Sequence, residues 1–187
     1  MRIIAGELRS RKLAFPKSKK TRPMTDRAKE TIFNILGETV VGASVLDLFA
    51  GSGSLGLETL SRGAAHVTFV EGGAWAYKSL LNNLKALHLE ERGFLLRQNI
   101  FRALKMLQKG RKSFTLIFLD PPYNKGLVKK ILNLLDQSDI VTPLTQLVVH
   151  RSRQEKLPET FEKLRVVREK QIGQACLSFL SCGTGGE

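Results

Sequence analysis

Thr115-Leu116-Ile117-Phe118-Leu119-Asp120-Pro121-Pro122-Tyr123 is the stretch around which the rest of this sequence is interpreted. Its apolar run, residues 116–119, leads directly into an acid, two prolines and a tyrosine. A short apolar run that ends in a turn signal is typical of a buried central strand in a parallel sheet. Ligands of open α/β sheets bind just beyond the carboxyl ends of such strands. We therefore expect residues 120–123 to lie at the edge of a binding site.

The residue types of this turn suit a planar group that carries an exocyclic amine. Each proline fixes φ at about −65° and lacks a backbone N–H, so the turn is rigid and its carbonyl groups have few local donors. Asp120 accepts one N–H of the amine, the carbonyl of Pro121 accepts the other, and the ring of Tyr123 stacks on the plane. The alternative is a strand-ending turn with no ligand.

A second motif precedes this stretch. Residues 45–49 predict a buried strand, and the G-x-G-x-x-G pattern of residues 51–56 follows it and opens a helix. A second strand is predicted at 66–70, and Glu71 ends it twenty residues after Gly51. In nucleoside-binding βαβ units an acid about 20 residues beyond the first glycine binds the ribose hydroxyls. The helix N-terminus supplies N–H groups for an anionic part of the ligand.

This motif indicates an adenosine-containing ligand without naming it. NAD(P) and S-adenosylmethionine both carry an adenosine ribose, so the glycine pattern alone fits either. Asn99, after the next predicted strand, either reaches the adenine edge or caps the helix that follows.

The other elements follow from capping and apolar periodicity. Thr25 is predicted to cap a helix that ends at Gly37, and Gly173 is predicted to turn a closing antiparallel pair. The remaining expected elements are helices at 75–87, 100–107 and 127–135 and strands at 94–97, 146–149, 162–170 and 174–181.

Basic residues are concentrated at the start of the chain. The net charge is +13, and residues 1–29 contain ten Lys or Arg but only Glu7 and Asp26 as acids. Clustered cations favour a polyanionic partner, although they also occur as a solvated tail. Interleaved apolar residues favour a folded hairpin that turns near Gly6. The expected RNA-contacting residues are Arg9, Arg11, Lys12, Lys17, Lys19, Lys20 and Arg22.

Composition favours a globular cytoplasmic protein. Hydrophobic residues make up 42% of the chain, and no apolar run approaches membrane length. Cys176 and Cys182 lie six residues apart without a C-x-x-C pattern, so we expect buried thiols and no metal site.

The motifs together resemble a known family. Asp47-Leu-Phe-Ala-Gly-Ser-Gly-Ser-Leu-Gly-Leu-Glu58 with Asp120-Pro-Pro-Tyr123 resembles amino-methyltransferases that use S-adenosylmethionine. The segments at 2–6, 21–23 and 60–64 narrow the resemblance to the bacterial 16S ribosomal RNA guanine-N2 methyltransferase family. The resemblance covers nearly the whole chain. Met24, His150 and Gln171-Ile172-Gly173 depart from the family pattern.

The resemblance implies an α/β fold: a Rossmann-like, seven-stranded class I methyltransferase sheet with helices on both faces, and a small basic N-terminal hairpin extension. Residues 1–24 would form the RNA-contacting extension and 25–187 the methyltransferase domain. It implies S-adenosylmethionine as cofactor, bound by Asp47, Phe49, Gly51, Ser52, Gly53, Glu71, Gly72, Asn99 and Ile100. It implies that Asp120, Pro121, Pro122 and Tyr123 carry the chemistry.

The expected reaction is an in-line displacement in which the guanine amine attacks the methyl group. The expected partner is 16S ribosomal RNA or the assembling small subunit, bound by a monomer with no membrane or metal involved. Three alternatives remain open: an amino-methyltransferase acting on DNA or on protein glutamine, a non-catalytic RNA-binding factor, and a nicotinamide enzyme.

Overall fold

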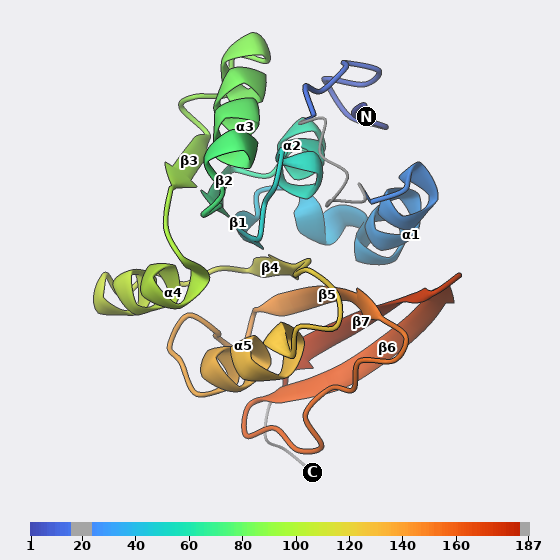
Figure 1. Ribbon diagram of the computed structural model, residues 1–187, viewed down its shortest axis with the longest axis vertical. Coiled ribbons are helices and arrows are strands. Elements are labelled where there is room, and N and C mark those ends of the chain that lie inside the picture. The colour runs from blue at the N-terminus through green and yellow to red at the C-terminus, as the bar shows by residue number, and fades with distance from the viewer. Residues whose placement is uncertain (16–23, 184–187) are drawn as a thin grey trace. The chain divides into compact units, whose positions relative to one another are not determined.

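The computed structural model describes residues 1–15 and 24–183, in which helices and strands alternate (Figure 1). The helices are α1 (Asp26–Leu36), the 3-10 helix η1 (Gly37–Val40), α2 (Ser54–Ser61), α3 (Ala74–Ala86), α4 (Ile100–Lys109) and α5 (Leu127–Asp136). The strands are β1 (Ser44–Leu48), β2 (His66–Val70), β3 (Gly93–Leu96), β4 (Leu116–Leu119), β5 (Gln146–Ser152), β6 (Leu164–Ile172) and β7 (Ala175–Cys182).

The strands form a seven-stranded sheet in the order β3-β2-β1-β4-β5-β7-β6. Pairs β1–β2, β2–β3 and β4–β5 are parallel, whereas β7 pairs antiparallel with β5 and β6. The expected seven-stranded α/β fold is confirmed, and so is the closing antiparallel pair.

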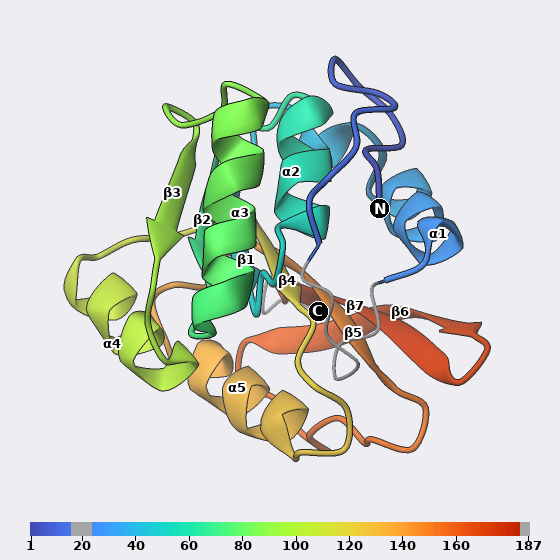
Figure 2. The same cartoon turned by 45° about the horizontal axis from the view of Figure 1, so that its top comes forward.

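The chain divides into two compact units, Met1–Ile100 and Phe101–Glu187. In the first unit, α2 and α3 lie side by side against the parallel strands β1–β3 (Figure 2). In the second unit, α5 connects β4 to β5, and β7 and β6 extend the sheet beyond β5 (Figure 1). The four residues of β4 are all buried, as expected for a central strand.

Helix α1 begins as its sequence predicts. The Thr25 side chain accepts a hydrogen bond from the backbone N–H of Ala28, and Gly37 caps the carboxyl end. Phe33 is buried on the apolar face of α1, and the charged residue Lys29 is fully buried in the same helix.

The N-terminal segment, residues 1–15, folds back on itself with a single bridge between Arg2 and Lys12. Its turn is at Gly6, where φ is +83° and a Cβ atom would lie 1.8 Å from the carbonyl oxygen of Ser61. Glycine is therefore required there by both backbone conformation and close packing.

The carboxylate of Glu58 binds this segment to α2. The backbone N–H groups of Ile4 and Ala5 donate to Glu58 Oε2 and Oε1 at 2.8 and 3.0 Å. The Lys29 ammonium lies 3.6 Å from Glu58 Oε2 and donates to the Arg2 carbonyl at 2.7 Å. The Lys29 and Glu58 side chains are both fully buried, so this ion pair fixes the segment from inside the unit.

Several predicted boundaries differ from the observed ones by one to three residues, and the difference in β5 affects the candidate site. Strand β5 was expected to end at Val149, but it continues through Ser152 because its last three residues pair with residues 175–177 of β7. His150 therefore lies inside a strand rather than beyond its end.

In the part of the chain that the structure describes, no helix is both long enough and apolar enough to cross a membrane. The same residues contain no cluster of three or more His, Cys, Asp or Glu that could hold a metal ion.

Candidate functional site

The first unit brings the expected cofactor-binding residues together at the carboxyl ends of β1, β2 and β3. The Ala50 N–H donates to the Val70 carbonyl at 3.0 Å, and the Glu71 N–H donates to the Leu96 carbonyl at 3.1 Å. The loops that follow the three strands therefore meet at one edge, where parallel sheets bind ligands.

The turn after β1 has a strained, compact backbone. Phe49 has φ +61°, which is uncommon for a residue with a side chain, and Gly51 and Gly53 have φ +58° and +88°. A Cβ on Gly53 would lie 2.4 Å from Leu80 Cδ1, so this glycine permits packing against α3. A Cβ on Gly51 would have no neighbour closer than 4.0 Å, so the space over this residue is open.

Glu71 accepts hydrogen bonds from the loop that follows β1 and from its own loop after β2. Its Oε2 accepts from the Gly51 N–H at 2.9 Å, and its Oε1 accepts from the Gly73 N–H at 2.5 Å. A carboxylate has about four acceptor sites, so Glu71 retains capacity for ligand hydroxyls. Gly72 and Asn99 are exposed beside it, whereas the side chain of Ile100 is buried at the start of α4.

Asp47 and Ser52 connect the turn to α2 and α3 through hydrogen bonds. Asp47 is 1% exposed, and its Oδ2 accepts from the backbone N–H of Gly56 in the first turn of α2 at 3.0 Å. The Ser52 carbonyl accepts from Nδ2 of Asn83 at 2.9 Å. The expected role of Asp47 on the cofactor stays a prediction.

Asn83 links this turn to the N-terminal segment. Its Oδ1 accepts from the Ala14 N–H at 2.7 Å, and its Nδ2 donates to the Ala14 carbonyl at 3.0 Å as well as to Ser52. Asn83 is 3% exposed, and its side-chain amide bonds to both Ala14 and Ser52. Sequence reasoning missed this residue because a single asparagine in a helix gives no signal of a contact with residue 14.

These residues fit an adenosine-containing cofactor with an anionic end. The hydroxyl of Ser54, at the N-terminus of α2, is buried and has no partner among the described residues. With the open space over Gly51 and the acceptor capacity of Glu71, this hydroxyl provides a polar cradle for a ligand.

The second unit carries the predicted Asp-Pro-Pro-Tyr turn at the end of β4. Because Leu119 pairs with Val149, the next residues of the two strands, Asp120 and His150, lie at the same level of the sheet. His150 Nδ1 is 2.8 Å from Asp120 Oδ1, and His150 Nε2 is 2.9 Å from the Tyr123 hydroxyl oxygen. The Asp120 side chain is 30% exposed, so its carboxylate is accessible to a ligand.

The two prolines differ in exposure. Pro121 is buried and Pro122 is exposed. Among the described residues, no donor is bonded to the Pro121 carbonyl oxygen, so this acceptor is available.

The Tyr123 hydroxyl remains protonated. Burial, together with the nearby carboxylates of Asp120 and Glu155, raises the pKa of Tyr123 to about 12. Tyr123 as a whole is 38% exposed.

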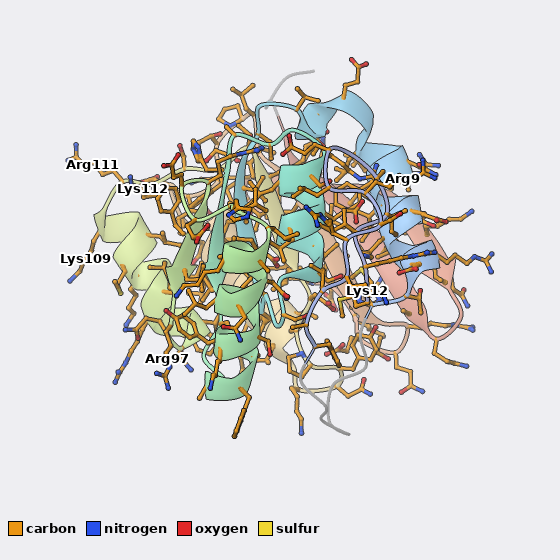
Figure 3. All side chains as sticks on the ribbon, turned by 90° about the horizontal axis from the view of Figure 1, so that it is seen from above. Arg9, Lys12, Arg97, Lys109, Arg111 and Lys112 are labelled. Atoms are coloured by element: carbon orange, nitrogen blue, oxygen red, sulfur yellow. The ribbon has the colours of Figure 1, made fainter. Side chains whose placement is uncertain are left out.

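The predicted RNA-contacting residues are only partly described. Arg9, Arg11 and Lys12 are exposed, and Arg9 and Lys12 extend from the N-terminal segment in Figure 3. The other members of that prediction lie outside the described residues: Lys17, Lys19, Lys20 and Arg22.

Comparison with known proteins identifies relatives along the whole chain. The chain is 39% identical to the Bacillus subtilis (strain 168) protein YlbH over 173 residues, covering 92% of this chain and 94% of that protein. It is 35% identical over 187 residues to the ribosomal RNA small subunit methyltransferase D of Escherichia coli (strain K12), covering 100% and 92%.

Solved structures agree with the fold. The Escherichia coli protein yhhF superposes with a TM-score of 0.86 at 36% identity and covers 97% of each chain. An RNA methyltransferase of Salinibacter ruber, solved with S-adenosyl-L-homocysteine, gives a TM-score of 0.67 at 14% identity, covers 89% of this chain and 97% of its own, and shows the shared fold alone.

A family model described as Conserved hypothetical protein 95 matches residues 1–181. That match spans both units and includes the glycine turn and the Asp-Pro-Pro-Tyr turn. The chain therefore belongs to this family, as an S-adenosylmethionine-dependent methyltransferase of the small subunit methyltransferase D type.

Proposed function

We propose that this chain transfers a methyl group from S-adenosylmethionine to the exocyclic N2 amine of a guanine in 16S ribosomal RNA. The observation that carries the proposal is the Asp120 carboxylate, fixed at the end of β4 and still 30% exposed, beside a proline carbonyl that accepts from no donor among the described residues. Family membership supplies the reaction class, and the name of the Escherichia coli relative supports ribosomal RNA of the small subunit as substrate.

Each group of the turn has a defined task in this proposal. Asp120 accepts one N–H of the amine and the Pro121 carbonyl accepts the other. Holding both hydrogens favours a pyramidal nitrogen, which frees the lone pair that the guanine ring otherwise delocalises. Tyr123 stacks on the base, which is worth about 1–3 kcal/mol for a base on an aromatic ring. After transfer, Asp120 or water takes the departing proton.

The residues of the first unit hold the cofactor, which supplies a methyl group activated by a positively charged sulfur. Glu71 accepts from the ribose hydroxyls, and Asn99 binds the adenine edge. The backbone of Gly51, Ser52 and Gly53 binds the methionine end, where the missing side chain of Gly51 permits close approach. Asp47, Phe49, Gly72 and Ile100 shape the walls of this cradle.

The exposed cations of the N-terminal segment bind RNA phosphates. Arg9, Arg11 and Lys12 provide salt-sensitive affinity that carries no sequence information. We further propose that the enzyme acts as a monomer in the cytoplasm, where small subunits assemble; sedimentation of the free protein tests the monomer.

The test measures transfer of radiolabelled methyl from S-adenosylmethionine to small subunits, naked 16S RNA, DNA and bulk protein. We expect label in 16S RNA, and mass spectrometry of the digested RNA should identify N2-methylguanosine. Label in DNA or protein, or on another RNA base, would refute the proposed substrate.

A second comparison tests the proposed role of Asp120. Asp120→Ala should abolish transfer while cofactor affinity stays within about twofold, because the carboxylate is assigned to the acceptor base. Retained turnover would remove Asp120 from the mechanism. Exposed Asp139→Ala is the matched control and should retain full activity.

A further inference from the structure

His150 is the central member of a hydrogen-bonded chain in the second unit. It contacts Asp120 Oδ1 through Nδ1 at 2.8 Å and the Tyr123 hydroxyl through Nε2 at 2.9 Å. The two rings meet edge to face, with centroids 5.5 Å apart and planes at 72°. The His150 side chain is 11% exposed and that of Asp120 is 30% exposed, so the histidine lies beneath the carboxylate.

Chemistry fixes the direction of the hydrogen bond between His150 and Asp120. An ionised Asp120 can only accept, so Nδ1–H of His150 must donate to it. The Tyr123 hydroxyl oxygen lies 2.9 Å from Nε2 and 3.4 Å from Nδ1, so the hydroxyl contacts the side of the imidazole that carries both nitrogens. The raised pKa of Tyr123 keeps this hydroxyl protonated.

We propose that His150 is a positioning residue for methyl transfer, because it holds the Asp120 carboxylate and the Tyr123 ring in the orientation that the acceptor base requires. This inference rests on the proposed function. Its physical basis is that His150 occupies Oδ1 of Asp120 and so leaves Oδ2 for the amine. A partly exposed carboxylate and a loop tyrosine otherwise sample several rotamers, and each would have to be ordered when substrate binds.

The alternative is that His150 only fills space between β5 and its neighbours. A space-filling role needs a side chain of similar volume, whereas a positioning role needs its hydrogen-bonding groups. His150→Leu retains most of the volume but removes both hydrogen bonds. His150→Gln retains a donor and an acceptor on one planar group, so it can still bridge Asp120 and Tyr123.

Steady-state kinetics separate the two roles. We expect His150→Leu to lower kcat roughly 10- to 100-fold, the equivalent of losing one or two hydrogen bonds to a charged or aligned group. The KM for S-adenosylmethionine should stay within twofold, because the residues assigned to the cofactor lie in the first unit. His150→Gln should recover most of the lost kcat. The control is His66→Leu, at an exposed histidine that starts β2.

A double-mutant cycle tests whether His150 acts through the tyrosine hydroxyl. In a Tyr123→Phe background, His150→Leu should cost less than in the wild type, because one of its two partners is already gone. Independent effects, equal losses in Leu and Gln variants, or wild-type kcat in His150→Leu would overturn the positioning role. Melting temperatures identify any variant whose loss reflects unfolding.

A spectroscopic measurement tests the chain without any activity. Nitrogen-15 NMR of labelled protein should show His150 protonated at Nδ1, the nitrogen that faces Asp120. A ring protonated at Nε2 alone would overturn the inference. If the wild type fails to methylate guanine N2, the proposed function fails, whereas the tautomer still decides whether this chain of bonds exists.

Discussion

Replacing Asn83 tests whether the N-terminal segment and the glycine turn are mechanically coupled. Asn83 makes three hydrogen bonds at 2.7–3.0 Å, two to Ala14 and one to the Ser52 carbonyl, and is 3% exposed. A buried hydrogen bond contributes about 0.5–1.5 kcal/mol net, so Asn83→Ala should lower the free energy of unfolding by about 2–4 kcal/mol. Release of the Ser52 carbonyl should also weaken S-adenosylmethionine binding roughly tenfold, the value of about one such bond.

The assay combines urea unfolding with titration calorimetry of S-adenosylmethionine. Asn82→Ala is the matched control, because Asn82 is exposed one position away on the same helix α3. This control should change the unfolding free energy by no more than about 0.5 kcal/mol. The reasoning is refuted if Asn83→Ala matches Asn82→Ala in both measurements. A loss of stability with unchanged cofactor affinity would refute the coupling alone.

Three further predictions use other contacts. Gly56→Ala should destabilise by about 1–3 kcal/mol in chemical unfolding, because its Cβ would lie 2.2 Å from the Phe69 ring, whereas Gly110→Ala should be tolerated because its nearest contact is 3.4 Å. Burial lowers the pKa of Lys29 below 10.5 and Glu58 opposes that shift, so Glu58→Gln should lower the pKa further. Between the native pKa of Lys29 and 10.5, the unfolded chain binds more protons than the native chain, so the free energy of unfolding rises with pH. This rise should be steeper in Glu58→Gln than in the wild type. Equal slopes in the two proteins would contradict the prediction. RNA affinity, measured by filter binding at several salt concentrations, should depend less on salt when Arg9, Arg11 and Lys12 of the N-terminal segment are changed to glutamine. The slope of log affinity against log salt concentration should fall by about 0.7–0.9 per lost phosphate contact. The same change in the exposed lysines of α5 should leave the slope unaltered.

Most of the fold was predictable because its signals are local. The buried strand at 116–119 and the strand at 66–70 have the predicted bounds, and Thr25 and Gly37 cap α1 as their residue types favour. The expected cofactor loops also meet at one edge, since the carboxyl ends of parallel strands must do so.

The candidate site was predictable only in part. Asp120 and Tyr123 follow from their positions after a buried strand, but His150 does not. Strand β5 was expected to stop before this histidine, and nothing nearby in sequence indicates that β7 pairs with residues 150–152 and keeps them in the sheet. Asn83 and the buried Lys29–Glu58 pair were missed for the same reason, because each contacts segments far away in the chain.

The sequence by itself determined the order of strands and helices along the chain, the two turns to which we assign the chemistry and the concentration of charge at the start of the chain. These depend on neighbouring residues: apolar periodicity, glycine conformations and proline rigidity act within a few positions. Only the tertiary structure decided which polar groups bond to which, so that Asn83 reaches Ser52 and His150 lies between Asp120 and Tyr123. The physical reason is that a buried polar atom must find its partner in space, and strand register rather than chain proximity brings that partner within reach.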